Sequence, residues 1–147
     1  MTVSRLVVAK ALMARLDGIT WATAHLGAID TAKARPVDAD GRVSPYVVLY
    51  PGLGRVRDAE DTVTGSSSAD LALLFQLTCV AGVADALLDL FDAVHDQVHL
   101  WSPGIAGIGG GRFRTPPGYD PGPMRRNDQA NPPRFWSPMQ YQLDTTS

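Results

Sequence analysis

The sequence predicts a single α+β domain, and three observations support that prediction. Apolar residues alternate from Leu71 onward, which is typical of a strand with one buried face. Directly after Gly82 the apolar spacing changes to that of a helix. A final stretch, residues 135–143, alternates again after a long Gly/Pro-rich segment. A strand that leads into an amphipathic helix has one covered sheet face, so we expect the other elements to dock against this pair.

The first element is a predicted helix over residues 3–17. Its apolar residues recur at helical spacing, namely Leu6, Ala9, Met13 and Leu16. Ser4 or Thr2 is suited to cap its start, and Gly18 is suited to the position just past its end. Residues 19–26 follow as a candidate strand, and the polar stretch 29–44 is predicted to be a loop.

Two further strands are predicted before the central one. Residues 46–50, Tyr-Val-Val-Leu-Tyr, are almost wholly apolar and lie between Pro45 and Pro51. Such a run indicates burial on both faces, or one face in a core and the other against a neighbour. Residues 55–63 are predicted to form a short edge strand, followed by a flexible Gly-Ser-Ser-Ser tip.

The central helix is predicted from the apolar stripe Val83, Leu87, Leu90, Phe91, Val94, Val98 and Trp101. Four aspartates, Asp85, Asp89, Asp92 and Asp96, fall on its other side. Their spacings of three and four place them on one helix face, and a solvated face is the simplest interpretation.

Residues 102–133 are dense in glycine and proline, so they cannot form a regular helix or a central strand. A connection of this length in a small domain is usually functional or disordered. Phe113, Tyr119 and Met124 lie within it, and we expect them to anchor it on a surface, most simply that of a neighbouring subunit. In the last strand, Pro138 cannot donate a ladder hydrogen bond, which predicts an edge strand or a bulge there.

Composition excludes several classes of protein. The 147 residues have a net charge of −2, which gives no electrostatic basis for bulk nucleic-acid or membrane binding. One cysteine excludes an internal disulfide framework and a multi-cysteine zinc site. No apolar run approaches the roughly 20 residues of a membrane span. We therefore expect a soluble protein made in the cytoplasm.

The sharpest chemical motif is His95-Asp96-Gln97-Val98-His99, in which two histidines lie four residues apart. Such a pair on a helix can bind zinc in the H-E-x-x-H motif, but here aspartate replaces the glutamate and no third ligand follows in sequence. We interpret His95 and His99 as residues at the boundary of the apolar stripe. Cys79 is predicted to be a buried apolar residue, and residues 107–111 lack the Lys-Ser/Thr of a phosphate loop. We therefore expect no catalytic residue, cofactor or metal.

The order helix, strand, strand, strand, helix, Gly/Pro-rich loop, strand resembles the tail terminator (tail completion) proteins of long-tailed bacteriophages. Three stretches carry the resemblance: residues 45–51 (Pro-Tyr-Val-Val-Leu-Tyr-Pro), residues 75–80 leading into 84–100, and residues 134–143. It spans most of the chain. The resemblance implies one α+β domain over residues 1–147, with two helices packed on a mixed, mostly antiparallel sheet.

The resemblance also implies a function. Six copies would form a ring on the head-proximal end of the tail tube, stop polymerisation of the major tail tube protein and join the tail to the head-completion or connector protein. The protein would then be part of the virion, assembled in the host cytoplasm, with genome DNA passing through the lumen without sequence-specific binding. It would act as a structural protein, with no enzymatic activity and no membrane partner.

A ring requires that one patch of a protomer meets a different patch on the next copy. The candidate subunit-interface residues are Tyr46, Tyr50, Phe113, Tyr119, Met124 and Trp136. The candidate lumen-facing residues are Asp85, Asp89, Asp92 and Asp96, whose carboxylates would repel the DNA backbone.

Three alternatives stay open at this point. The chain could be another head–tail completion protein. It could be a small metal-dependent hydrolase using His95 and His99. It could also be a small-molecule-binding domain whose Gly-rich loop is a lid, which a deep pocket beneath residues 104–111 would favour.

Overall fold

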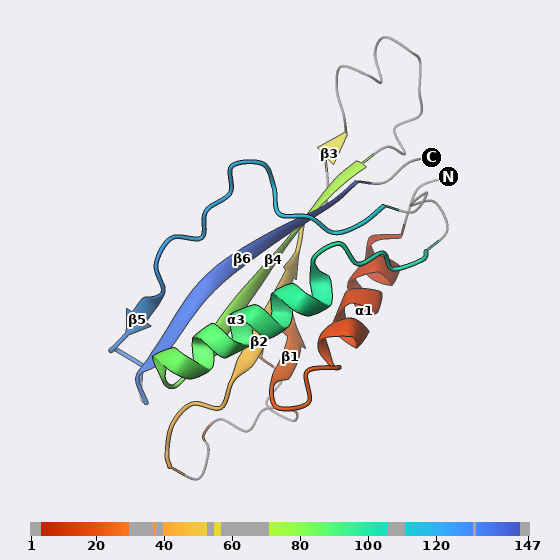
Figure 1. Cartoon of the computed structure of the whole chain (residues 1–147). Helices are drawn as coiled ribbons and strands as arrows, with labels where there is room; N and C mark the ends of the chain where they lie inside the picture. Colours follow the sequence, from red (N-terminus) through yellow and green to blue (C-terminus); the bar gives the residue numbers. More distant parts are fainter. Residues whose placement is uncertain are drawn as a thin grey trace, which may run out of the picture.

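A mixed sheet covered on one face by two helices makes up the described part of the chain (Figure 1). The computed structural model describes residues 4–29, 37, 40–52, 55–56, 71–105, 111–130 and 132–144. The elements follow in the order α1 (Arg5–Leu16), β1 (Thr23–Leu26), β2 (Tyr46–Pro51), β3 (Arg55–Val56), β4 (Leu71–Ala81), α3 (Ala84–Val98), β5 (Arg125–Asn127) and β6 (Arg134–Asp144).

The strands are arranged in the order β1-β2-β4-β6-β5, and β3 also pairs with β4. β1 runs parallel to β2, and all other pairs are antiparallel. The predicted α+β fold with a mixed, mostly antiparallel sheet is therefore confirmed. None of the helices in the described residues is long and apolar enough to cross a membrane.

The elements begin and end close to where the sequence patterns predict. Ser4 caps α1 as expected, because its Oγ accepts a hydrogen bond of 3.3 Å from the amide of Val7. The predicted strand over 19–26 is shorter than expected and begins at Thr23. Ile19 instead donates its amide to the carbonyl of Leu16, and this turn leads directly out of the helix. β3 covers only the start of the strand predicted over 55–63, whose remainder lies outside the described residues.

The core lies between the helices and one face of the sheet. β4 and β6 place their odd-numbered side chains there, and register pairs them as Leu73 with Leu143, Phe75 with Tyr141, and Leu77 with Met139. On the helix side of the core, α3 contributes its predicted apolar stripe. Four residues of this stripe are buried, namely Leu87, Leu90, Val94 and Val98. Burial of this continuous apolar cluster is the main stabilising contribution to the fold.

The described part of the Gly/Pro-rich segment runs along the outer edge of β6, within its own chain. At Phe113 the segment forms backbone hydrogen bonds with Trp101 and Leu100. The next residue, Arg114, exchanges two backbone hydrogen bonds with Gln142 of β6. Further on, the three-residue strand β5 pairs with the start of β6. Residues 106–110 lie outside the described part.

Pro138 occupies an edge position, as its missing donor predicts. Its carbonyl oxygen accepts a hydrogen bond of 3.0 Å from the hydroxyl of Tyr119, on the side of β6 away from β4. The amide of a strand residue points to the same side as its carbonyl, so the N–H that proline lacks would also face this outer edge. The ladder between β4 and β6 therefore continues through Thr78 and Pro138 without a bulge.

Gly82 is required where β4 turns into α3. A Cβ at this position would lie 2.7 Å from the backbone nitrogen of Val43 and 2.9 Å from its carbonyl oxygen. We expect Gly82→Ala to lower the free energy of unfolding by about 1–3 kcal/mol, because backbone has to move. Denaturant titration checks this. Gly18→Ala, whose nearest backbone contact is 3.1 Å, should cost less, and equal effects of the two changes would contradict the prediction.

Candidate functional site

The sheet face opposite the helices carries no described helix, and we call it the open sheet face, although Val48 and Val80 on this face are buried. One row across it is defined by register: Tyr46 of β2, Val80 of β4, Trp136 of β6 and Arg125 of β5. A more polar row, Tyr50, Gln76 and Gln140, lies further along the strands. Tyr50 is 44% exposed. Aromatic side chains on a partly exposed sheet face are typical of a surface that binds a protein partner.

Two arginines border the aromatic row. The guanidinium of Arg125 lies 5.0 Å from the ring centre of Trp136, in a cation–π contact. Arg134 donates a hydrogen bond of 3.3 Å to the hydroxyl of Tyr46, which joins the ends of β6 and β2. One arginine therefore lies over the ring of Trp136, and the other binds the hydroxyl of Tyr46.

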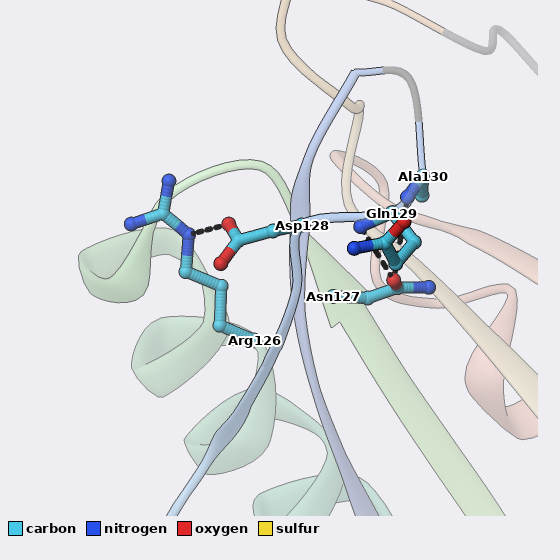
Figure 2. A network of polar contacts seen from close by, with 5 residues as sticks. All are labelled: Arg126, Asn127, Asp128, Gln129 and Ala130. Atoms are coloured by element: carbon cyan, nitrogen blue, oxygen red, sulfur yellow. Dashed lines mark hydrogen bonds and ion pairs between the residues drawn. The ribbon is translucent and has the colours of Figure 1, made fainter.

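The residues that follow Arg125 form a turn with its own polar contacts (Figure 2). Asn127 accepts hydrogen bonds from the amides of Gln129 and Ala130 through its Oδ1. Arg126 forms an ion pair with Asp128, so its charge is compensated locally. Because successive strand residues point to opposite faces, Arg126 lies over Phe135 on the helix side, and Arg125 lies on the open sheet face.

Two more arginines lie at the other end of the open sheet face. Arg114 pairs with Gln142, the neighbour of Leu74 on this face, and Leu74 is 40% exposed. Arg112 and Arg114, together with Gln142 and Asp144, line a groove of about 420 Å³. We call these four arginines, Arg112, Arg114, Arg125 and Arg134, the basic border. They lie at both ends of the strands on the open sheet face.

The outer face of α3 has the opposite charge. Asp85, Asp89, Asp92 and Asp96 are all exposed there. Leu88 lies among them and is 55% exposed. Beside Leu88 is an apolar groove of about 370 Å³, lined by Leu87, Leu88, Phe91, Gly122, Pro123, Met124 and Ser137.

The structure brings three of the six predicted interface residues together. Tyr46, Tyr50 and Trp136 share the open sheet face. Tyr119 and Met124 are half-buried against their own chain: Tyr119 binds the edge of β6, and Met124 packs against the core and lines the groove beside α3.

Phe113 is wrong as an interface residue. It is fully buried, with its ring stacked on Trp101 and edge-on to Phe75 at centroid distances of 5.7 and 5.4 Å. The expectation that a neighbouring subunit anchors the segment through this residue is therefore corrected. Burial of the Phe113 ring in the core of its own protomer is favoured, because it removes the apolar ring from water without a partner subunit.

His95 of α3 and His99, the residue at the C-cap of this helix, lie close together beside β6. Their rings are stacked with centroids 4.5 Å apart, and His95 Nδ1 shares a hydrogen bond of 2.9 Å with the hydroxyl of Tyr141. Nδ1 of His99 is buried and has no hydrogen-bond partner among the residues that the structure describes. In the described residues, no three or more His, Cys, Asp or Glu side chains are grouped as a metal would require. The arrangement is that of a packed boundary between α3 and the sheet.

Burial raises the pKa of the Cys79 thiol to about 12. Burial is also the main cause that raises the pKa of Tyr141, and the nearby Cys79 and Asp96 add to it. Cys79 is thus a neutral, enclosed thiol, which agrees with its interpretation as a buried apolar residue.

These two groups predict a loss of stability at high pH. Their folded-state pKa values lie above the unfolded ones, so the unfolded chain releases protons first. The stabilisation is complete below about pH 9 and falls as pH rises toward 12. Urea unfolding at pH 7 to 11 checks this, and Cys79→Ala should flatten the decline that begins near pH 9. A decline that is as steep in Cys79→Ala as in the unchanged protein would contradict the assignment to this thiol.

The sequence did not indicate Leu88, Leu74, Arg125 or Arg134 as surface-site residues. Leu88 had a detectable signal, since it is an apolar residue outside the apolar stripe of its helix. The other three had none, because their place on the open sheet face depends on strand pairing and register.

Comparison with known proteins adds no relative. No protein-family model matches the chain, and no curated protein matches it either. The function therefore has to be inferred from the residues and their geometry.

Proposed function

We propose that this protein is a structural component of a bacteriophage tail, the tail terminator, which assembles as a ring on the head-proximal end of the tail tube. The observation that supports this best is the presence of two unlike surfaces on opposite layers of one small domain. One is the aromatic open sheet face bordered by arginines, and the other is the acidic outer face of α3 with Leu88.

Two unlike surfaces on one chain favour contacts between different patches of neighbouring copies. Such heterologous contacts close into rings when the rotation between copies allows it. The fold also agrees with the expectation from the resemblance, and the element order differs from the expected one by two short strands, β3 and β5. In this proposal the ring has six copies, ends polymerisation of the tube protein, binds the head connector and lets DNA pass through its lumen.

The first experiment measures the particle itself. Light scattering and negative-stain electron microscopy of the purified chain should show rings, with a mass close to six times 15.7 kDa. The second adds the protein to a polymerising tail tube protein and measures tube length. Shortened, capped tubes are expected. A chain that stays monomeric at every concentration and leaves tube length unchanged would contradict the proposal.

A further inference from the structure

We infer that the outer face of α3 of one copy packs on the open sheet face of the next, so that one heterologous contact repeats around the ring. This inference rests on the proposed function, because it names the surfaces by which copies of the chain join. Its occupant is a second copy of this chain, and each protomer supplies both halves of the contact.

Charge supplies the first argument. The outer face of α3 has four exposed aspartates, and Arg112, Arg114, Arg125 and Arg134 border the open sheet face. Asp144 is an acidic residue on that face, and its Oδ1 accepts a hydrogen bond from the side-chain amide of Gln142. The two surfaces lie on opposite sides of the same two-layer domain, so one chain cannot bring them together. Opposite charges on two faces of one protomer favour a head-to-tail contact between copies.

The dimensions agree as well. From Asp85 to Asp96 the helix rises about 16 Å, at 1.5 Å per residue. On the sheet, Arg125 lies opposite Trp136 and Arg114 lies opposite Gln142. Those two positions on β6 are about 20 Å apart, at 3.3 Å per residue. The row of aspartates is therefore about 4 Å shorter than the spacing of these two positions, a difference that the long, flexible arginine side chains span.

An apolar centre completes each surface. Leu88 projects from the middle of the acidic stripe and is more than half exposed. On the open sheet face, the half-buried rings of Tyr46 and Trp136 flank Val80, which is itself buried, so the two rings supply the accessible apolar surface. An apolar side chain on an aromatic platform, surrounded by opposite charges, has the layout of a specific interface with a polar rim.

Helix α1 limits where this contact can form. Its Arg5, Lys10 and Arg15 lie in the same layer as α3, and Asp17 at its C-cap is acidic, so α1 is mainly basic where α3 is acidic. Placing α1 over the arginines of the next copy would bring like charges together. A contact through α3 is therefore favoured over a contact through α1. In this arrangement the four aspartates of α3 lie between neighbouring copies and do not face the lumen of the ring, contrary to the prediction from the sequence.

Reversing the charges of one surface at a time tests the inference. Variant A carries Asp85→Lys, Asp89→Lys and Asp92→Lys, and variant B carries Arg114→Glu, Arg125→Glu and Arg134→Glu. Alone, each variant opposes like charges at every contact, and we expect its dissociation constant to rise at least 100-fold. In an equal mixture every contact is again complementary, so rings of alternating A and B should form. Native mass spectrometry measures their composition.

Lys10→Glu is the matched control, because it reverses a charge in the same helix layer outside the proposed contact and should leave the rings intact. Circular dichroism of each variant verifies folding before mixing. If the wild-type chain forms rings and variants A and B still form them alone, or fail to recover as a mixture, this inference is wrong and the proposed function stands. If the wild-type chain forms no ring at all, the proposed function itself fails.

Discussion

Replacing Phe113 by alanine should lower the free energy of unfolding by about 3–5 kcal/mol, the usual cost of truncating a buried aromatic residue. Phe113 is fully buried, and its ring fills the space between Trp101 and Phe75. A small domain has a total stability of roughly 5–15 kcal/mol, so this loss is a large fraction of it. Chemical denaturation of the monomeric chain at low concentration measures the change.

The same substitution should release the segment that follows Phe113. The backbone of Phe113 forms hydrogen bonds with Trp101 and Leu100. The backbone of the next residue, Arg114, forms two with Gln142. Loss of the ring removes the apolar anchor, so limited proteolysis should cut residues 111–124 faster than in the unchanged protein. Phe113→Leu is the control, since it keeps most of the apolar volume. If Phe113→Ala leaves stability intact but abolishes assembly, the residue is an interface residue after all.

Leu90→Ala and Leu88→Ala should have opposite consequences, although the two residues lie on the same helix. Leu90 is fully buried beneath α3, and its truncation should cost about 2–5 kcal/mol of unfolding free energy. Leu88 is exposed on the outer face, and its truncation should change stability by less than about 0.5 kcal/mol. Thermal and urea unfolding of both variants test this half of the prediction.

Assembly is expected to respond in the reverse manner. Leu88→Ala should weaken self-association by removing the apolar centre of the α3 surface, whereas Leu90→Ala should weaken it only in proportion to the unfolded fraction. Sedimentation velocity over a concentration series separates the two effects. A Leu88→Ala variant that associates as tightly as the unchanged protein would show that α3 is not the contact.

The sequence predicted the elements well, because their signals are local. The alternation from Leu71 and the helical spacing from Val83 match β4 and α3, and Ser4 caps α1. The strand predicted over residues 19–26 was too long at its start. There, backbone hydrogen bonds to the end of α1 outweighed the strand preference of Trp21.

The candidate site was predicted only in part. Tyr46, Tyr50 and Trp136 were recognised as large rings on strands that needed a neighbour, and they share the open sheet face. Phe113 was misassigned, since nothing in a Gly/Pro-rich segment indicates whether a ring returns to its own core. The basic border was missed, because residues from β5, β6 and the segment at 112–114 meet there only after the strands pair.

By itself, the sequence determined that this chain is an α+β domain with an acidic face on its central helix, because hydrophobic periodicity acts over a few residues. The tertiary structure alone decided which side chains face one another across the sheet and which surface of the protomer carries the opposite charge. Those relations depend on strand order and register, which are set by burial of the whole core and by contacts between residues far apart in the chain.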